Sequence, residues 1–151
     1  TIAFMVIGAS PSGTGGGLKT TTLRILINST ISTLQGKTDV IIYKRRVPVN
    51  LILKALGVLC ASVTLLSIVT ALIAITDPDL SFIQILFEVC SAFATVGLST
   101  GITGSLSALG KLIIVVTMYI GRVGVLIVIN TLVRESRPSA IQYPEENLLV
   151  G

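Results

Sequence analysis

Long uncharged apolar segments dominate the chain. Residues 55–76 carry no formal charge and are mostly Leu, Val, Ile and Ala. As an α-helix this segment would be about 33 Å long, which matches the hydrocarbon core of a bilayer. Residues 112–133 form a second such segment, interrupted only by Arg122. Its aliphatic side chains contribute about −4 to −8 kcal/mol to insertion, which exceeds the cost of about 2.5 to 3.5 kcal/mol for a central arginine. The pattern predicts membrane-spanning helices over 51–76 and 108–134.

A shorter apolar segment lies between these two spans. Residues 80–93 include Glu88 and would form a helix only about 21 Å long, too short to cross a bilayer. A re-entrant helix over 79–93 fits this length. The residues that follow, 94–101, are rich in Thr, Ser and Gly and do not have a helical composition. Non-helical backbone at membrane depth has to be buried in protein or line a cavity, because lipid cannot satisfy its N–H and C=O groups.

The tripeptide Thr95-Val96-Gly97 in this stretch fits the chemistry of a potassium filter. Potassium channels select ions with backbone carbonyls that replace the hydration shell, around a Thr-Val-Gly core. Glycine there permits backbone geometry that other residues avoid. An ordinary loop is the alternative interpretation of so short a motif, but its position between a short helix and a full span favours a filter. The carbonyls expected to bind K⁺ are those of Thr95, Val96, Gly97, Leu98 and Ser99.

The N-terminal part of the chain has a similar interruption. Residues 1–7 are apolar but far too few to span a bilayer, residues 8–17 form a Gly/Ser/Thr-rich loop, and residues 18–34 have a helical pattern. We therefore predict that residues 1–34 make one crossing with a loop in its middle. The chain opens inside apolar sequence without an initiator Met or a signal peptide, so we expect it to be a segment of something longer.

Composition excludes several classes of protein. Hydrophobic residues make up 52% of the 151 residues and charged residues 12%, whereas soluble domains carry roughly 25% charged residues. A soluble domain is therefore not expected. The absence of histidine excludes His-activated nucleophiles and His-bound metals. Cys60 and Cys90 lie in apolar stretches and are expected to behave as small hydrophobic residues.

The positions of the charges orient the predicted spans. Basic residues concentrate in the connection over 35–50 and just after the last span, whereas the turn over 77–79 is acidic. By the positive-inside rule, the basic loop and the C-terminal tail over 135–151 are cytoplasmic and the acidic turn is outside. The net charge of +4 is thereby explained without nucleic acid.

Two longer motifs resemble a known family. Residues 87–99, Phe-Glu-Val-Cys-Ser-Ala-Phe-Ala-Thr-Val-Gly-Leu-Ser, with Tyr-Ile-Gly-Arg-Val-Gly at 119–124, resemble the fourth pore repeat of the Trk/Ktr/HKT superfamily of potassium transporters. Residues 8–20 resemble the loop that breaks the inner helix of the third repeat. The resemblance covers nearly the whole chain. It implies an all-α membrane protein of potassium-channel-like fold, in which four repeats of span, pore helix, filter and span surround one pore.

The resemblance also implies roles for individual residues. In the family the interrupted loop lies beneath the filter and acts as the gate, whereas the alternative for this chain is a flexible kink. Arg122 matches an arginine that projects into the pore below the filter as a barrier to cations; the alternative is a structural arginine paired with Glu88 or with helix carbonyls. Glu88 is expected to support the filter from behind. The gate residues that match are Ser12, Gly13, Thr14, Gly15, Gly16, Gly17 and Lys19.

Further expectations concern ions and partners. K⁺ is the expected transported ion, sodium coupling is left open, and neither a cofactor nor an enzymatic activity is expected of this chain. The expected partners are the remaining repeats of the transporter, a second copy in a homodimer, membrane lipid and a cytosolic ring of nucleotide-binding subunits. Nucleotide would act only through that ring. The basic run 44–46 is either a solvated cytoplasmic anchor or, as the resemblance implies, a contact for the ring. The expected location is the plasma membrane, crossed several times.

Two other classes of function remain to be weighed. Residues 13–20 nearly match a phosphate-binding loop, but Leu18 occupies the position where a glycine must precede the lysine. The residues that follow offer membrane spans instead of a strand ending in a metal-binding aspartate. A structural membrane module without a pore is the other alternative. Replacing Gly97 by serine in the whole transporter would distinguish it, because only a carbonyl filter would change its ion preference.

Overall fold

Helices form nearly all of the regular structure in the computed structural model, which describes residues 2–7, 15–36, 40–42, 45–125 and 127. A pair of two-residue antiparallel strands, in which Ile41 faces Arg46 and Ile42 faces Arg45, interrupts this pattern. The expectation of an all-α membrane fold is confirmed for the described residues. The elements are α1 (Ile2–Val6), α2 (Thr20–Leu34), β1 (Ile41–Ile42), β2 (Arg45–Arg46), α3 (Val49–Thr76), α4 (Phe82–Ala94), the 3₁₀ turn η1 (Ile102–Gly104) and α5 (Ala108–Val123).

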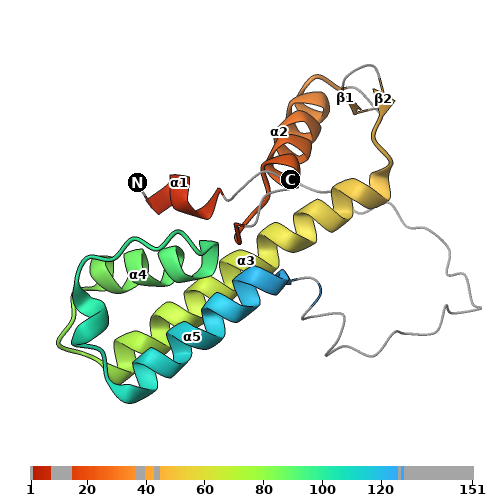
Figure 1. Ribbon diagram of the computed structural model, residues 1–151. Helices are drawn as coiled ribbons and strands as arrows, with labels where there is room; N and C mark the ends of the chain where they lie inside the picture. The colour runs from red at the N-terminus through yellow and green to blue at the C-terminus, as the bar shows by residue number, and fades with distance from the viewer. Residues whose placement is uncertain (1, 8–14, 37–39, 43–44, 126, 128–151) are drawn as a thin grey trace, which may run out of the picture.

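Helix α3 is the long axis of the molecule, and α5 runs beside one half of it (Figure 1). Within the described part of the chain, α3 is the one helix long and apolar enough to cross a membrane. One face of α3 is buried, and its polar groups there are satisfied within the helix. The hydroxyls of Ser62 and Thr70 donate to the carbonyls of Val58 and Leu66, each over 2.7 Å. These side chains can therefore pack in an apolar interior without an unpaired hydrogen-bonding group.

Helix α4 is short and is packed on several sides by α1, α3 and α5. Ile85, Val89 and Phe93 are each at most 1% exposed and form the centre of the core. The helix begins at Phe82, later than the predicted start at residue 79, because the chain first makes a turn in which the Leu80 N–H donates to the Asp77 carbonyl over 3.3 Å. A helix of 13 residues, buried along most of its length, thus lies where the sequence predicts a short helix.

Helix α5 begins at a well-defined cap and ends earlier than predicted. The Ser107 side chain accepts a hydrogen bond from the Gly110 N–H over 3.0 Å, which is a typical N-cap. Regular helix stops at Val123, because Gly124 adopts φ 96° and ψ 129°, outside helical geometry. The predicted uninterrupted helix over 108–134 is therefore wrong at Gly124. Residues 128–134 of that prediction lie outside the described residues.

The two N-terminal pieces meet through a backbone contact. Ile7 and Leu18 form a parallel bridge, and the Leu18 N–H donates to the Val6 carbonyl over 3.1 Å. A parallel bridge means that the chain leaves at Ile7 and returns at Leu18 running in the same direction. Helix α2 then continues away from α1 toward the small hairpin (Figure 1).

Candidate functional site

The end of the Gly-rich loop lies directly against the end of α4. The Gly16 N–H donates to the side-chain oxygen Oγ1 of Thr95 over 2.9 Å, although 79 residues separate them in sequence. Gly16 is buried, and a Cβ atom there would lie 2.9 Å from the Gly121 carbonyl oxygen and 3.0 Å from that of Phe93. The loop, α4 and α5 thus meet through their backbones, and glycine is required because a side chain would not fit.

The contact between α4 and α5 depends on Gly121 in the same way. A Cβ atom at Gly121 would overlap the Phe93 carbonyl oxygen and lie 2.8 Å from the Phe93 carbonyl carbon. Close approach of helix backbones is a known use of small residues in membrane proteins. Arg122 is the next residue, so this close contact fixes the point on α5 from which the arginine side chain projects.

The candidate filter segment, residues 95–99, leaves α4 through an unusual backbone turn. Thr95 adopts φ 54° and ψ 39°, in the left-handed region that few residues other than glycine enter. The Val96 N–H donates to the Ser91 carbonyl over 3.0 Å, and the Leu98 N–H donates to the Ser91 hydroxyl oxygen over 3.0 Å. Residues 96–100 are exposed and have no regular secondary structure, and Gly97 adopts φ 81°. The segment is therefore held to α4 at its start while its backbone stays non-helical.

Glu88 holds the far end of this segment. Its carboxylate is 6% exposed and accepts hydrogen bonds from the Ser99 hydroxyl, over 2.9 Å, and from the Thr103 hydroxyl. The Gly101 N–H in turn donates to the Ser99 oxygen over 3.0 Å. A cavity of about 180 Å³ lies behind the segment and is lined by Glu88, Gly97 and Leu98 among others. Glu88 therefore contacts the segment from the side of α4.

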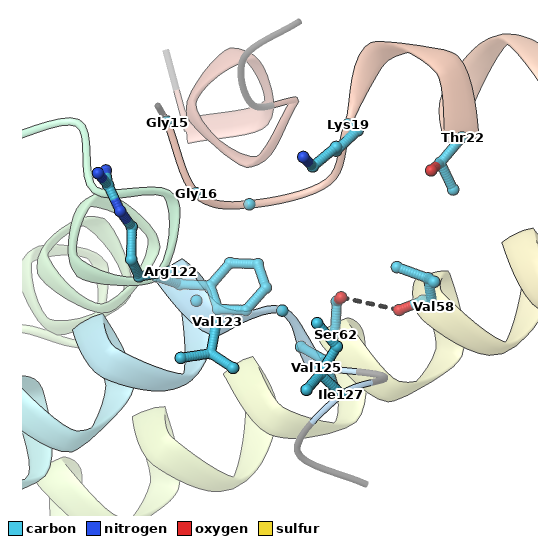
Figure 2. A pocket seen from close by; sticks show the side chains of 14 residues that line it. Gly15, Gly16, Lys19, Thr22, Val58, Ser62, Arg122, Val123, Val125 and Ile127 are labelled. Carbon is cyan, nitrogen blue, oxygen red and sulfur yellow. Dashed lines mark hydrogen bonds between the residues drawn. The ribbon is translucent and has the colours of Figure 1, made fainter. Parts of the chain in front are cut away.

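A second cavity, of about 370 Å³, lies on the other side of the junction at Gly16. Figure 2 shows Lys19 on the continuation of the segment that carries Gly15 and Gly16, and Arg122 on the neighbouring helix α5; both line the cavity. The described residues that line this cavity include these two cations and no acidic side chain. Arg122 is exposed and Lys19 directly precedes α2. The cavity wall is therefore electropositive.

The opposite end of α5 is tied to α3 through Asp77. Its carboxylate accepts the Ser107 backbone N–H over 2.8 Å, the Ser107 hydroxyl over 3.0 Å and the Thr76 hydroxyl over 3.0 Å. The backbone hydrogen bond from Ser107 does most to lower the pKa of Asp77. The two hydroxyl bonds and the charge of Lys111 also lower this pKa, whereas burial opposes them. The carboxylate is thus held in its charged form where it positions the N-cap of α5.

Comparison with known protein families identifies the family of this chain. Residues 1–140 match the model of the TrkH family, described as cation transport protein. The chain belongs to the TrkH family. This membership agrees with the apolar helix α3 and with the resemblance to Trk/Ktr transporters in the sequence.

Several curated relatives are similar to this TrkH-family chain over its whole length. The chain is 38% identical over 149 residues to the Ktr system potassium uptake protein D of Bacillus subtilis, covering 99% of this chain and 33% of that protein. It is 39% identical over 150 residues to the Ktr system potassium uptake protein B of Vibrio alginolyticus, covering 99% of this chain and 32% of the relative. It is also 40% identical over 156 residues to the potassium/sodium uptake protein NtpJ of Enterococcus hirae, covering 100% of this chain and 35% of that relative. The chain spans about a third of the length of these curated relatives.

Most of the described candidate residues of this TrkH-family chain line one of two cavities. Gly15, Gly16 and Gly17 line one cavity with Lys19 and Arg122. The candidate gate residues Ser12, Gly13 and Thr14 lie outside the described residues. The proposed alternative partner of Arg122, Glu88, lies in the other cavity with Gly97, and both of its carboxylate oxygens accept hydroxyl hydrogen bonds.

The sequence did not predict the polar residues that form hydrogen bonds around the candidate filter segment. Ser91 follows Glu88 by three positions, so both lie on the same face of α4. That spacing was a readable signal in an otherwise apolar helix. Thr103 could not have been found in this way, because its contact with Glu88 depends on how the chain returns after residue 99.

Proposed function

We propose that this chain forms part of a potassium-uptake pore, in which Thr95 to Ser99 supply one of the filter segments. The observation that carries the proposal is the junction at Gly16, where the Gly-rich loop contacts the first residue of the candidate filter. The names of the relatives, potassium uptake proteins of the Ktr system, support the choice of ion. The conclusion concerns transport, not catalysis.

Backbone geometry supports a carbonyl filter at this position. The short helix α4 ends at the filter, and its C-terminal end carries the negative end of the helix dipole, which favours a cation nearby. The segment beyond Thr95 cannot use its carbonyls in a helix, because its backbone is non-helical and exposed. Carbonyls that are free of helical hydrogen bonds are the groups that replace water around K⁺. The contacts of Glu88 with Ser99 and Thr103 would keep the spacing of these carbonyls fixed.

The electropositive cavity supports a barrier below the filter. Arg122 and Lys19 line it beside the loop, and charges of this sign raise the energy of a cation in a low-dielectric space. Small residues can enter or leave such a space at little steric cost. We therefore propose that residues 12–17 with Lys19 form the gate, and that Arg122 is the electrostatic barrier next to it.

Potassium uptake by the whole transporter tests this function. Deleting residues 13–17 should raise K⁺ flux, because the gate is removed, and Arg122→Gln should raise it, because the barrier is removed. Gly97→Ser should change the preference for K⁺ over Na⁺. Each variant needs a surface-expression control. Unchanged flux in a folded, membrane-inserted deletion variant would exclude the gate, and unchanged selectivity in Gly97→Ser would exclude the filter.

The wider assembly is also a proposal. The relatives named as parts of a Ktr system support a multi-component transporter, for which we propose a homodimer with a cytosolic ring of nucleotide-binding subunits. The basic connection over 35–50 would face that ring if it is cytoplasmic, as the charge distribution favours. Co-purification with and without substitutions of the basic run 44–46 tests the contact. Sodium coupling would be measured by K⁺ uptake with and without Na⁺.

A further inference from the structure

The hydrogen bond between the loop and the filter segment uses an oxygen atom that an ion could also use. The acceptor of the Gly16 N–H is the Thr95 hydroxyl oxygen, at the end of the filter segment nearest the loop. A hydroxyl has two acceptor lone pairs, and the N–H occupies one of them. The partial positive charge of an N–H group also lies at that oxygen, where it opposes a cation.

We infer that the Thr95 hydroxyl is a potassium-sensitive latch for the loop, an inference that rests on the proposed filter and gate. When the innermost ion position is empty, the hydroxyl holds Gly16 and the loop stays docked. When K⁺ occupies that position, the ion and the N–H compete for one oxygen, and the loop contact weakens. Linkage makes the effect reciprocal, so a docked loop lowers the affinity of the innermost position for K⁺ by the same factor.

The geometry makes Thr95 the fixed partner and the loop the partner that moves. The Thr95 N–H donates to the Ala92 carbonyl over 3.1 Å, and the next residue is held to Ser91. The Thr95 oxygen is thus presented at one place by the end of α4. On the loop side, Gly16 is confined by carbonyl oxygens of two neighbouring helices rather than by hydrogen bonds to them. Loss of the bond to Thr95 therefore removes the polar contact that the structure gives to the Gly16 N–H.

Hydrogen–deuterium exchange of the full-length transporter tests the latch. The probe is the loop peptide that contains Gly16, compared in potassium chloride and in the chloride salt of a large impermeant organic cation. We expect faster exchange in K⁺ by between about twofold and about tenfold, the range that one net hydrogen bond supports. Equal exchange of the wild-type loop in the two salts would overturn the inference without any variant.

Three substitutions sharpen the test. Thr95→Val keeps the shape but removes the acceptor, so the loop should exchange fast in both salts. Thr95→Ser keeps a hydroxyl and should restore the dependence on K⁺. Thr64→Val removes a hydroxyl from an exposed position on α3 and should leave the dependence intact. A potassium effect that persists in Thr95→Val would show that the ion acts elsewhere.

Uptake measurements separate this inference from the proposed function. If deletion of residues 13–17 raises flux and Thr95→Val leaves loop exchange unchanged, the latch is wrong and the gate stands. If the deletion leaves flux unchanged, the gate itself is wrong.

Discussion

Replacing Gly121 by alanine tests the close contact on which the site depends. In an ordinary exposed helix the change would stabilise the protein by up to about 1 kcal/mol, because alanine is the better helix former. Here the new methyl group would overlap the Phe93 carbonyl oxygen and lie 2.8 Å from its carbon, whereas ordinary van der Waals contact begins at 3.4 Å. The obstacle is backbone, so no change of rotamer can relieve the overlap.

Helices α4 and α5 would have to separate by more than half an ångström to admit the methyl group. Overpacking of this kind costs about 1 to 3 kcal/mol, and the rigid backbone favours the upper part of that range. After the propensity gain is subtracted, we expect a net loss of about 1 to 2 kcal/mol.

Gly57→Ala is the matched control, because Gly57 lies within α3 and a Cβ there meets nothing within 4 Å. Thermal unfolding of the purified transporter, followed by the loss of monodisperse protein on a sizing column, should give a lower midpoint for Gly121→Ala than for Gly57→Ala. Potassium uptake should fall in parallel, since the candidate filter is held to α4, one of the two separated helices. Equal midpoints for the two variants would refute the reasoning.

Three other variants test separate contacts. Glu88→Gln should lower thermal stability by about 1 to 3 kcal/mol and reduce the preference for K⁺ over Na⁺, because the amide offers one acceptor where the carboxylate serves two hydroxyls; retained selectivity at equal stability would count against the support role. The pKa of Asp77 is lowered below its ordinary value of 3.8. The contribution of its carboxylate to the free energy of unfolding is therefore complete above that pH and is lost as pH falls through the lowered pKa of the folded state. When stability is measured against pH, this loss on acidification should therefore be absent in Asp77→Asn and present in Asp79→Asn. Gly16→Ala should displace the loop and raise K⁺ flux, because its methyl group would meet two carbonyl oxygens at 2.9 and 3.0 Å, whereas Gly104→Ala, in open space, should leave flux unchanged.

The helices that membrane thickness dictates could be predicted from the sequence. The long apolar run gave α3, and the shorter run gave α4, since length against bilayer thickness is a strong constraint. Helix ends were predicted less well where specific polar contacts decide them. The turn that is hydrogen-bonded at Asp77 makes α4 begin later than predicted, and the backbone of Gly124 interrupts the last helix. A hydropathy pattern does not contain either feature, because each depends on one residue and its neighbours.

The candidate site was predictable in its parts but not in its assembly. The Gly-rich loop, the Thr-Val-Gly motif and Arg122 stood out as exceptions in apolar sequence. Their meeting point did not, because Gly16, Phe93 and Gly121 are far apart along the chain and touch through main-chain atoms. Main-chain contacts have no signature in side-chain type except the requirement for glycine. The glycines at 16 and 121 were visible, but which backbones they admit is a property of the fold.

For the proposed gate, the junction of three backbones offers a physical reason why a small movement of the loop would control the pore. Packed backbones are nearly incompressible, so Gly16 either fits between the carbonyls of Phe93 and Gly121 or leaves that position altogether. Such a contact has two arrangements rather than a continuous range, which is how sub-ångström shifts are amplified into switching. The side-chain oxygen of Thr95 adds one directional hydrogen bond to this steric choice. In the proposed gate, steric fit would therefore define the docked position, and the hydrogen bond at Thr95 would bias how often the loop occupies it.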